Sequence, residues 1–129
     1  MKITKFEEIE GWQLARDLTR AIYDVVKSER FSRDFGLRGQ ICRACVSVMS
    51  NVAEGFNSGS NAEFIRFLGY SQRSCSEVQS QLYIALDQRY LAQDDFKVLY
   101  DLASRVSSTI GGFIRYLKTQ SKPPPAKNP

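Results

Sequence analysis

The chain has 129 residues, of which 43% are hydrophobic and 25% are charged. These values fit one soluble globular domain with a single core. No apolar run reaches the roughly 18 residues needed to cross a bilayer, which argues against a membrane-spanning protein. The three cysteines, Cys42, Cys45 and Cys75, are an odd number in apolar surroundings, so we expect reduced thiols and a cytoplasmic protein.

The formal net charge of +4 suggests a nucleic-acid partner, but the excess is local. Residues 115–129 contain no acidic residue and four basic ones: Arg115, Lys118, Lys122 and Lys127. The rest of the chain is neutral. Any basic footprint is therefore a patch or the C-terminal tail, and not a basic domain.

The first predicted helix runs from about residue 11 to residue 28. One apolar face contains Trp12, Ala15, Leu18, Ile22 and Val25, which recur at helical spacing. Thr4 and Glu7 are spaced as an earlier capping box, which leaves the start of this helix open. Turn-forming residues then predict a break at residues 31–36.

The second predicted helix spans residues 37–56 and is the most informative stretch. Ile41, Cys45, Val48 and Val52 form its apolar stripe. A second stripe beside it is small or polar: Gln40, Ala44, Ser47, Asn51 and Glu54. A surface helix normally places large charged residues there, so we expect this helix to pack on two sides, in a bundle that itself assembles.

Two further helices follow. Ser60 and Glu63 fit a capping box for a third helix that continues to about residue 89. Asp94 is expected to cap the fourth helix, with Asp95 in its first turn. Three successive prolines lack backbone donors and cannot continue a helix, so residues 119–129 are predicted to be a disordered or polyproline tail.

Short connections between helices of similar length predict an all-α fold, an antiparallel up-down-up-down four-helix bundle over residues 1–118. The stripes predict nine buried side chains: Trp12, Ile41, Val48, Val52, Leu68, Val78, Leu82, Val106 and Ile110.

A polar network is expected between the second and third helices. Residues at equal distance from the turn near Gly59 should face each other, which places Arg43 beside Glu77 and predicts an ion pair. The alternative is that both side chains are solvated or lie in a subunit contact. The network contains Arg43, Ser47, Asn51, Glu54, Ser74 and Glu77.

Catalytic and metal-binding patterns are absent from the sequence. It has no histidine, no GxxxxGK[ST] loop and no GxGxxG loop. Cys42 and Cys45 form a CxxC inside a periodic helix, where core packing is favoured over a metal or redox site. We therefore expect a non-enzymatic protein without cofactor or metal.

Eight Phe, six Tyr and one Trp exceed what one four-helix core encloses easily. The aromatic residues at stripe edges have three interpretations: partial burial, stacking on single-stranded bases, and subunit contact, which we favour. The candidate nucleic-acid contacts are Arg66, Arg73, Arg115 and Lys118.

The residue pattern also resembles a known family. The matching elements are Trp12-Gln13, Phe35-Gly36-Leu37, Gln40-Ile41, Arg43-Ala44, Ser50-Asn51-Val52-Ala53-Glu54-Gly55, Glu63-Phe64, Phe67-Leu68, Ser74, Glu77 and Gln81-Leu82. This chain is similar to the bacterial four-helix-bundle proteins first noticed as products of intervening sequences in large-subunit ribosomal RNA genes, often labelled ribosomal-protein-like.

That resemblance implies a bundle, a homopentamer and a connection to RNA, but no catalytic residue. Met49 stands where many relatives have proline, and the arginine usual after the Glu-Gly pair is missing here. Our leading functional hypothesis is a homo-oligomeric, nucleic-acid-binding or ribonucleoprotein-associated protein. The alternative is a protein-binding scaffold with no nucleic-acid role.

Overall fold

The computed structural model describes residues 2–120, and the predicted tail beyond them lies outside the described residues. Within that range the structure is all-helical, without a strand. The elements are η1 (Phe6–Glu8), α1 (Glu10–Val25), α2 (Glu29–Arg33), α3 (Phe35–Phe56), α4 (Asn61–Asp87) and α5 (Gln93–Gln120).

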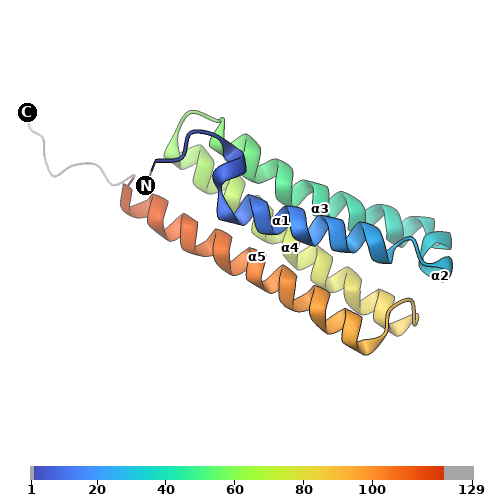
Figure 1. Cartoon of the computed structure of the whole chain (residues 1–129). Helices are drawn as coiled ribbons and strands as arrows, with labels where there is room; N and C mark the ends of the chain where they lie inside the picture. The colour runs from blue at the N-terminus through green and yellow to red at the C-terminus, as the bar shows by residue number, and fades with distance from the viewer. Residues whose placement is uncertain (1, 121–129) are drawn as a thin grey trace, which may run out of the picture.

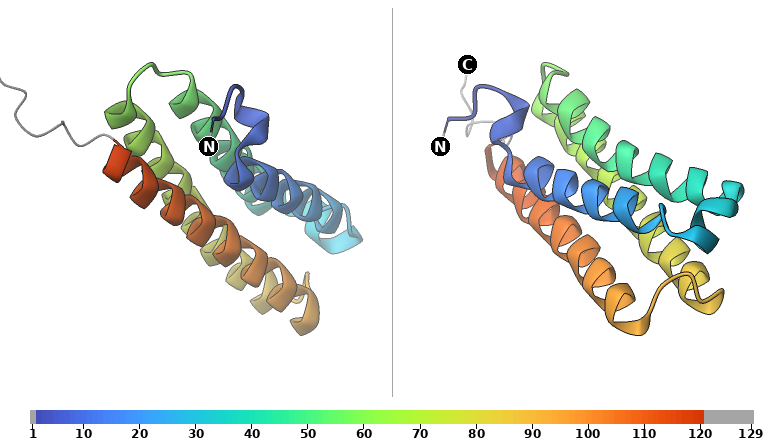
Figure 2. Two further views of the ribbon diagram at one scale, coloured as in Figure 1. Left: turned by 60° about the vertical axis from the view of Figure 1, so that its left-hand side comes forward. Right: turned by 45° about the vertical axis from the view of Figure 1, so that its right-hand side comes forward.

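The four long helices form the expected antiparallel bundle, as Figure 1 shows. Helix α3 packs on α1 and α4, and α5 packs on α4 and α1, so each long helix has two neighbours. The views of Figure 2 show that the N-terminal segment, the α3–α4 turn and the end of α5 lie at one end of the bundle. Short helix α2 and the α4–α5 turn lie at the other end.

The core follows the predicted stripes closely. Eight of the nine side chains expected in it are at most 1% exposed: Ile41, Val48, Val52, Leu68, Val78, Leu82, Val106 and Ile110. Trp12 is the exception. It is only half-buried, with its ring 5.2 Å from that of Phe6 and beneath the guanidinium of Arg16. The prediction that the Trp12 side chain is fully buried was therefore wrong.

The helix starts show which caps form. The Ser60 hydroxyl accepts a hydrogen bond from the Glu63 amide at 3.1 Å, as predicted for α4. Helix α5 begins at Gln93, two residues earlier than a cap at Asp94 implies, so Asp94 lies in its first turn and is not its cap. Its carboxylate still lies near the positive end of the helix dipole. At the N-terminus the Thr4 amide donates to Glu8, and not to Glu7.

Two segments differ from the prediction. Residues 29–33, expected partly as a turn, form the short helix α2, because the fully buried Phe31 anchors this segment to the core. Helix α5 continues to Gln120, two residues beyond the predicted end of the bundle.

Gly55 allows α3 and α4 to approach closely where they meet at the turn. A Cβ atom on Gly55 would lie 2.9 Å from Phe64 Cδ1, 2.9 Å from Phe67 Cβ and 3.3 Å from the Phe64 carbonyl oxygen. On Gly111 it would lie 3.0 Å from Nε2 of the Gln72 side chain on α4. No helix within residues 2–120 has the length and apolar character to span a membrane.

We expect Gly55→Ala to lower the free energy of unfolding by about 1–3 kcal/mol, because the methyl group overpacks the α3–α4 contact. Gly69→Ala is the matched control. No atom lies within 4 Å of its added Cβ, so the better helix propensity of alanine should raise stability by about 0.5–1 kcal/mol. Urea denaturation of both variants measures the difference, and equal effects would contradict the close approach.

Candidate functional site

The outer face shared by α3 and α4 contains most of the predicted site residues. Ser47 Oγ and Ser74 Oγ lie 2.8 Å apart across the two helices. Asn51 Nδ2 donates to the carbonyl oxygen of Ser47 at 2.9 Å and to its hydroxyl at 3.0 Å. Deeper in the seam, the buried hydroxyl of Ser71 donates to the Val48 carbonyl at 2.8 Å. The structure thus brings together three of the six predicted network residues and fixes the register of the helices.

The other three members of the predicted network do not join it. Arg43, Glu54 and Glu77 are exposed, and no ion pair links Arg43 to Glu77 among residues 2–120. The guanidinium of Arg43 lies over Gly39 of its own helix instead, with Nη1 3.1 Å from the Cβ position. The predicted pair is wrong for the single chain. Both groups lie at the solvated rim, where an ion pair gains little over hydration.

A shallow hollow borders this seam between α3 and α4. Arg43 and Glu77 both line it, together with Ser47, Gln81 and Ile84. The side-chain oxygen of Gln81 is buried there without a hydrogen-bond partner within residues 2–120. Buried polar atoms are nearly always paired, so this amide oxygen is an exception in the seam. No sequence pattern marks Gln81 as a site residue, because the burial of its amide oxygen depends on the side-chain conformation.

A cluster of arginine and aromatic side chains lies further along the same face of α4. We call Arg66, Phe67, Tyr70 and Arg73 the α4 cluster. The Arg66 guanidinium lies 5.4 Å from the centroid of the Phe67 ring and 5.5 Å from that of Tyr70, while Arg73 lies 5.4 Å from Tyr70. Arg66 Nη1 also donates to the Tyr70 hydroxyl at 2.7 Å. Guanidinium groups beside aromatic rings form cation–π contacts, and both kinds of side chain are used to stack on nucleic-acid bases.

Glu63 sets the charge environment of the cluster. Its carboxylate forms an ion pair with Arg66, and this hydrogen bond is the largest cause that raises the pKa of Arg66 above its ordinary value. Arg73 has no carboxylate partner among the described residues. The cluster therefore presents one neutralised and one unneutralised guanidinium.

The two remaining candidate nucleic-acid contacts lie on α5. Arg115 folds its guanidinium over its own helix, with Nη1 3.7 Å from the Cβ position of Gly111. Lys118 is exposed in the last turn. Of the four predicted contacts, the structure thus brings Arg66 and Arg73 together around one ring and places Arg115 and Lys118 on another helix.

The opposite end of the bundle has a second aromatic and basic cluster. Phe35 is 73% exposed beneath the Arg38 guanidinium, and Arg30 lies over the Tyr90 ring, whose hydroxyl donates to Asp34 at 2.9 Å. The turn-forming residues of this segment predict a turn and no site here. Three arginines interspersed with two aromatic residues between positions 30 and 38 are the sequence feature that could have indicated the cluster.

The thiols are buried between the helices. Burial raises the pKa values of Cys45 and Cys75 to about 12, and it also raises the pKa of the half-buried Cys42. None of them forms a disulfide, and no group of three potential ligands suited to a metal occurs within residues 2–120. Cys45 is fully buried and Cys42 half-buried, so both side chains pack as small apolar groups within α3.

Comparison with known proteins identifies relatives. Residues 7–112 match the model of the 23S rRNA-intervening sequence protein family. A similar solved structure is the 1.70 Å crystal structure of a protein of unknown function from the S23 ribosomal protein family of Bacteroides thetaiotaomicron. It is 16% identical, with a TM-score of 0.74 over 81% of this chain and 95% of that chain, so the likeness is one of fold. A comparison with curated protein sequences gives no significant match.

We expect iodoacetamide at pH 8 to label Cys42 in the folded protein and to leave Cys45 and Cys75 unmodified. With pKa values of about 12, only about 10⁻⁴ of either buried thiol is ionised at this pH. Mass spectrometry before and after unfolding in urea measures the modification. Cys42→Ser should abolish the native label, and native alkylation of Cys45 or Cys75 would show that the helices separate more easily than the structure implies.

Proposed function

Because the chain belongs to the 23S rRNA-intervening sequence protein family, we propose that it is a non-enzymatic protein that assembles with copies of itself and binds single-stranded RNA. The α4 cluster is the observation that supports RNA binding. Its aromatic rings supply stacking surfaces and its guanidinium groups attract phosphates. Each copy supplies one cluster, so assembly multiplies a weak site by avidity.

The hollow beside Gln81 supports self-assembly. The buried, unpaired amide oxygen of Gln81 lies there beside small polar residues and the exposed apolar side chain of Ile84. Aromatic and apolar residues with arginine are typical of the centre of protein interfaces. The family resemblance implies five subunits in such an assembly. Along α4, the cluster ends at Arg73 and the hollow begins at Glu77, about 6 Å further at 1.5 Å per residue, so the two surfaces adjoin on one face.

A scaffold that binds only proteins is the second candidate. Its support is the charge balance of the same face, where Arg43, Arg66 and Arg73 are matched by Glu54, Glu63 and Glu77. A neutral face gains little from phosphate groups. The dependence of binding affinity on salt concentration distinguishes the two functions, since only RNA binding releases counterions.

Tyr70→Leu should weaken binding of a fluorescein-labelled oligouridylate by about 5- to 150-fold, which corresponds to the ~1–3 kcal/mol of one stacked base. Arg73→Gln should reduce the slope of log affinity against log salt, by about 0.7 for each phosphate that the variant no longer neutralises. Fluorescence anisotropy in a salt series measures both effects.

Arg20→Gln is the matched control for this prediction. Arg20 is exposed on α1, away from the cluster, with Asp17 at 3.9 Å as its only ion-pair partner among the described residues. Its replacement should leave affinity and slope unchanged. Equal losses in all three variants, or no binding by the unaltered chain, would favour the scaffold.

Ile84→Glu should convert the oligomer into smaller species, because a buried unpaired carboxylate costs several kcal/mol. Val98→Glu is the control, since Val98 on α5 is more exposed than Ile84, at 65% against 46%. Sedimentation velocity at micromolar concentration measures the mass of each variant. If the unaltered chain is monomeric, self-assembly is refuted. If only the Val98 variant dissociates, the subunit interface lies on α5 and not at the hollow.

A further inference from the structure

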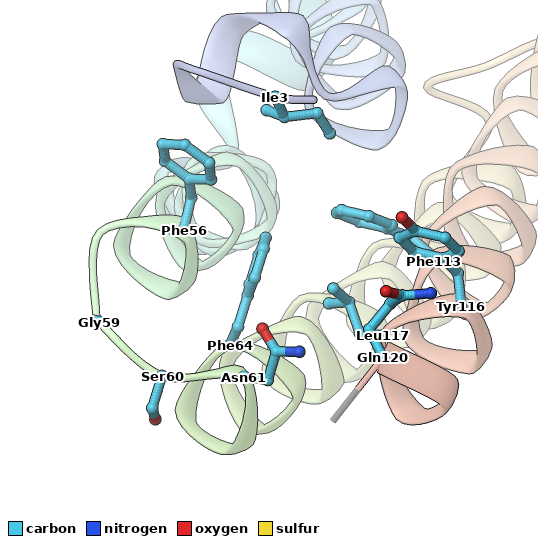
Figure 3. Close-up of a pocket in the computed structure, with 10 residues that line it drawn as sticks. All are labelled: Ile3, Phe56, Gly59, Ser60, Asn61, Phe64, Phe113, Tyr116, Leu117 and Gln120. Carbon is cyan, nitrogen blue, oxygen red and sulfur yellow. The ribbon is translucent and has the colours of Figure 1, made fainter. Parts of the chain in front are cut away.

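An apolar groove crosses the end of the bundle where α5 finishes. Figure 3 shows its lining, with Phe113, Tyr116 and Leu117 on α5 facing Phe56, Phe64 and Ile3. Gly59 of the α3–α4 turn and Asn61 at the start of α4 line the side opposite α5, and Gln120 of α5 also lines the groove. The groove holds about 360 Å³, at the lower end of the range for ligand sites, so a short extended segment fits.

The aromatic side chains make this groove unlike the other hollows. The Phe64 and Phe113 rings meet edge to face at 5.4 Å, and the Phe113 and Tyr116 rings stack with centroids 6.1 Å apart. Phe56 adds a ring 6.0 Å from that of Phe64. Tyr116 is 43% exposed, so its ring is available for contact. Grooves lined by aromatic rings are the common docking sites of proline-rich segments.

Acidic groups adjoin the rings. A second hollow shares Ile3, Phe113 and Tyr116 with the groove and is lined by Glu8 and Glu10. The hydrogen bond from the Thr4 amide lowers the pKa of Glu8, so this carboxylate is charged at neutral pH. Aromatic rings beside carboxylates thus suit a segment that combines proline with lysine.

We propose that residues 121–129 of the same chain bind in this groove, with Pro123–Pro125 against the aromatic rings. Their sequence, SKPPPAKNP, has three successive prolines flanked by Lys122 and Lys127, which match the rings and the neighbouring carboxylates. A polyproline conformation exposes its rings on every side and loses little entropy on binding.

The reach of the chain supports binding within one molecule. Gln120 lines the groove, and Pro123 follows it by three residues, which span at most about 10 Å. Nine residues at roughly 3.1 Å each extend about 28 Å, enough to cross from α5 to the α3–α4 turn. The other possible occupants are the same segment of a second copy and an unrelated apolar molecule.

The test is ¹⁹F NMR of the full chain labelled with 3-fluorotyrosine, in which Tyr116→Phe assigns the Tyr116 resonance. Replacing Pro123, Pro124 and Pro125 with glycine should shift this resonance. Tyr83 is the internal control, because it is 50% exposed on α4 and packs on Phe96, away from the groove. A Tyr116 resonance that is unchanged in the glycine chain would overturn the proposal.

Two additional samples identify the occupant. Adding a synthetic peptide of residues 121–129 to the chain ended at Gln120 should restore the full-length Tyr116 resonance, whereas the glycine version of the peptide should not. Failure of the proline peptide, or equal effects of both peptides, would count against the site. In the last sample, the fluorotyrosine-labelled variant with glycine at positions 123–125 is refolded together with unlabelled chains of the unaltered sequence. Recovery of the full-length resonance there would assign the groove to the segment of a second copy and refute binding within one chain.

Discussion

The pairing of α3 with α4 is the contact on which the rest of the bundle depends. Gly55 allows the two backbones to approach near the turn, and the Ser71 hydroxyl ties α4 to the Val48 carbonyl deep in the seam. The contact between Ser47 and Ser74 repeats this tie nearer the surface. A shift by one residue would break these bonds and would leave buried polar groups unsatisfied, which costs about 1–3 kcal/mol for each group. The seam therefore fixes the alignment on which the faces toward α1 and α5 are built.

Much of the fold could be predicted from the sequence, because burial in a helix follows its 3.6-residue period. Ile41 and Val48 are fully buried for this reason, and Ser47 and Ser74, both assigned to the polar network between the second and third predicted helices, do meet across α3 and α4. The family assignment also agrees with the residues that suggested it. Helix α2 was missed because a five-residue helix has little local signal and is held by the packing of Phe31.

The candidate site was less predictable than the fold. Helical spacing placed Arg66 and Arg73 on one face, but only the side-chain conformations bring their guanidinium groups around Tyr70. Arg43 and Glu77 lie near each other as expected, yet both remain solvated, since a pair at the rim gains little free energy. The burial of Gln81 follows from rotamer choice, which a periodic pattern does not encode.

The two ends of the described chain lie at the same end of the bundle, as Figures 1 and 2 show. This arrangement makes the topology suited to circular permutation. A short linker can join residue 120 to residue 2, and new termini can open in the α4–α5 turn at residues 88–92. The permuted chain would keep α3, its turn and α4 continuous, so the seam would still form between neighbours in sequence. The permuted chain would then have the same arrangement of helices around the core, although the helices follow one another in a different order along the sequence.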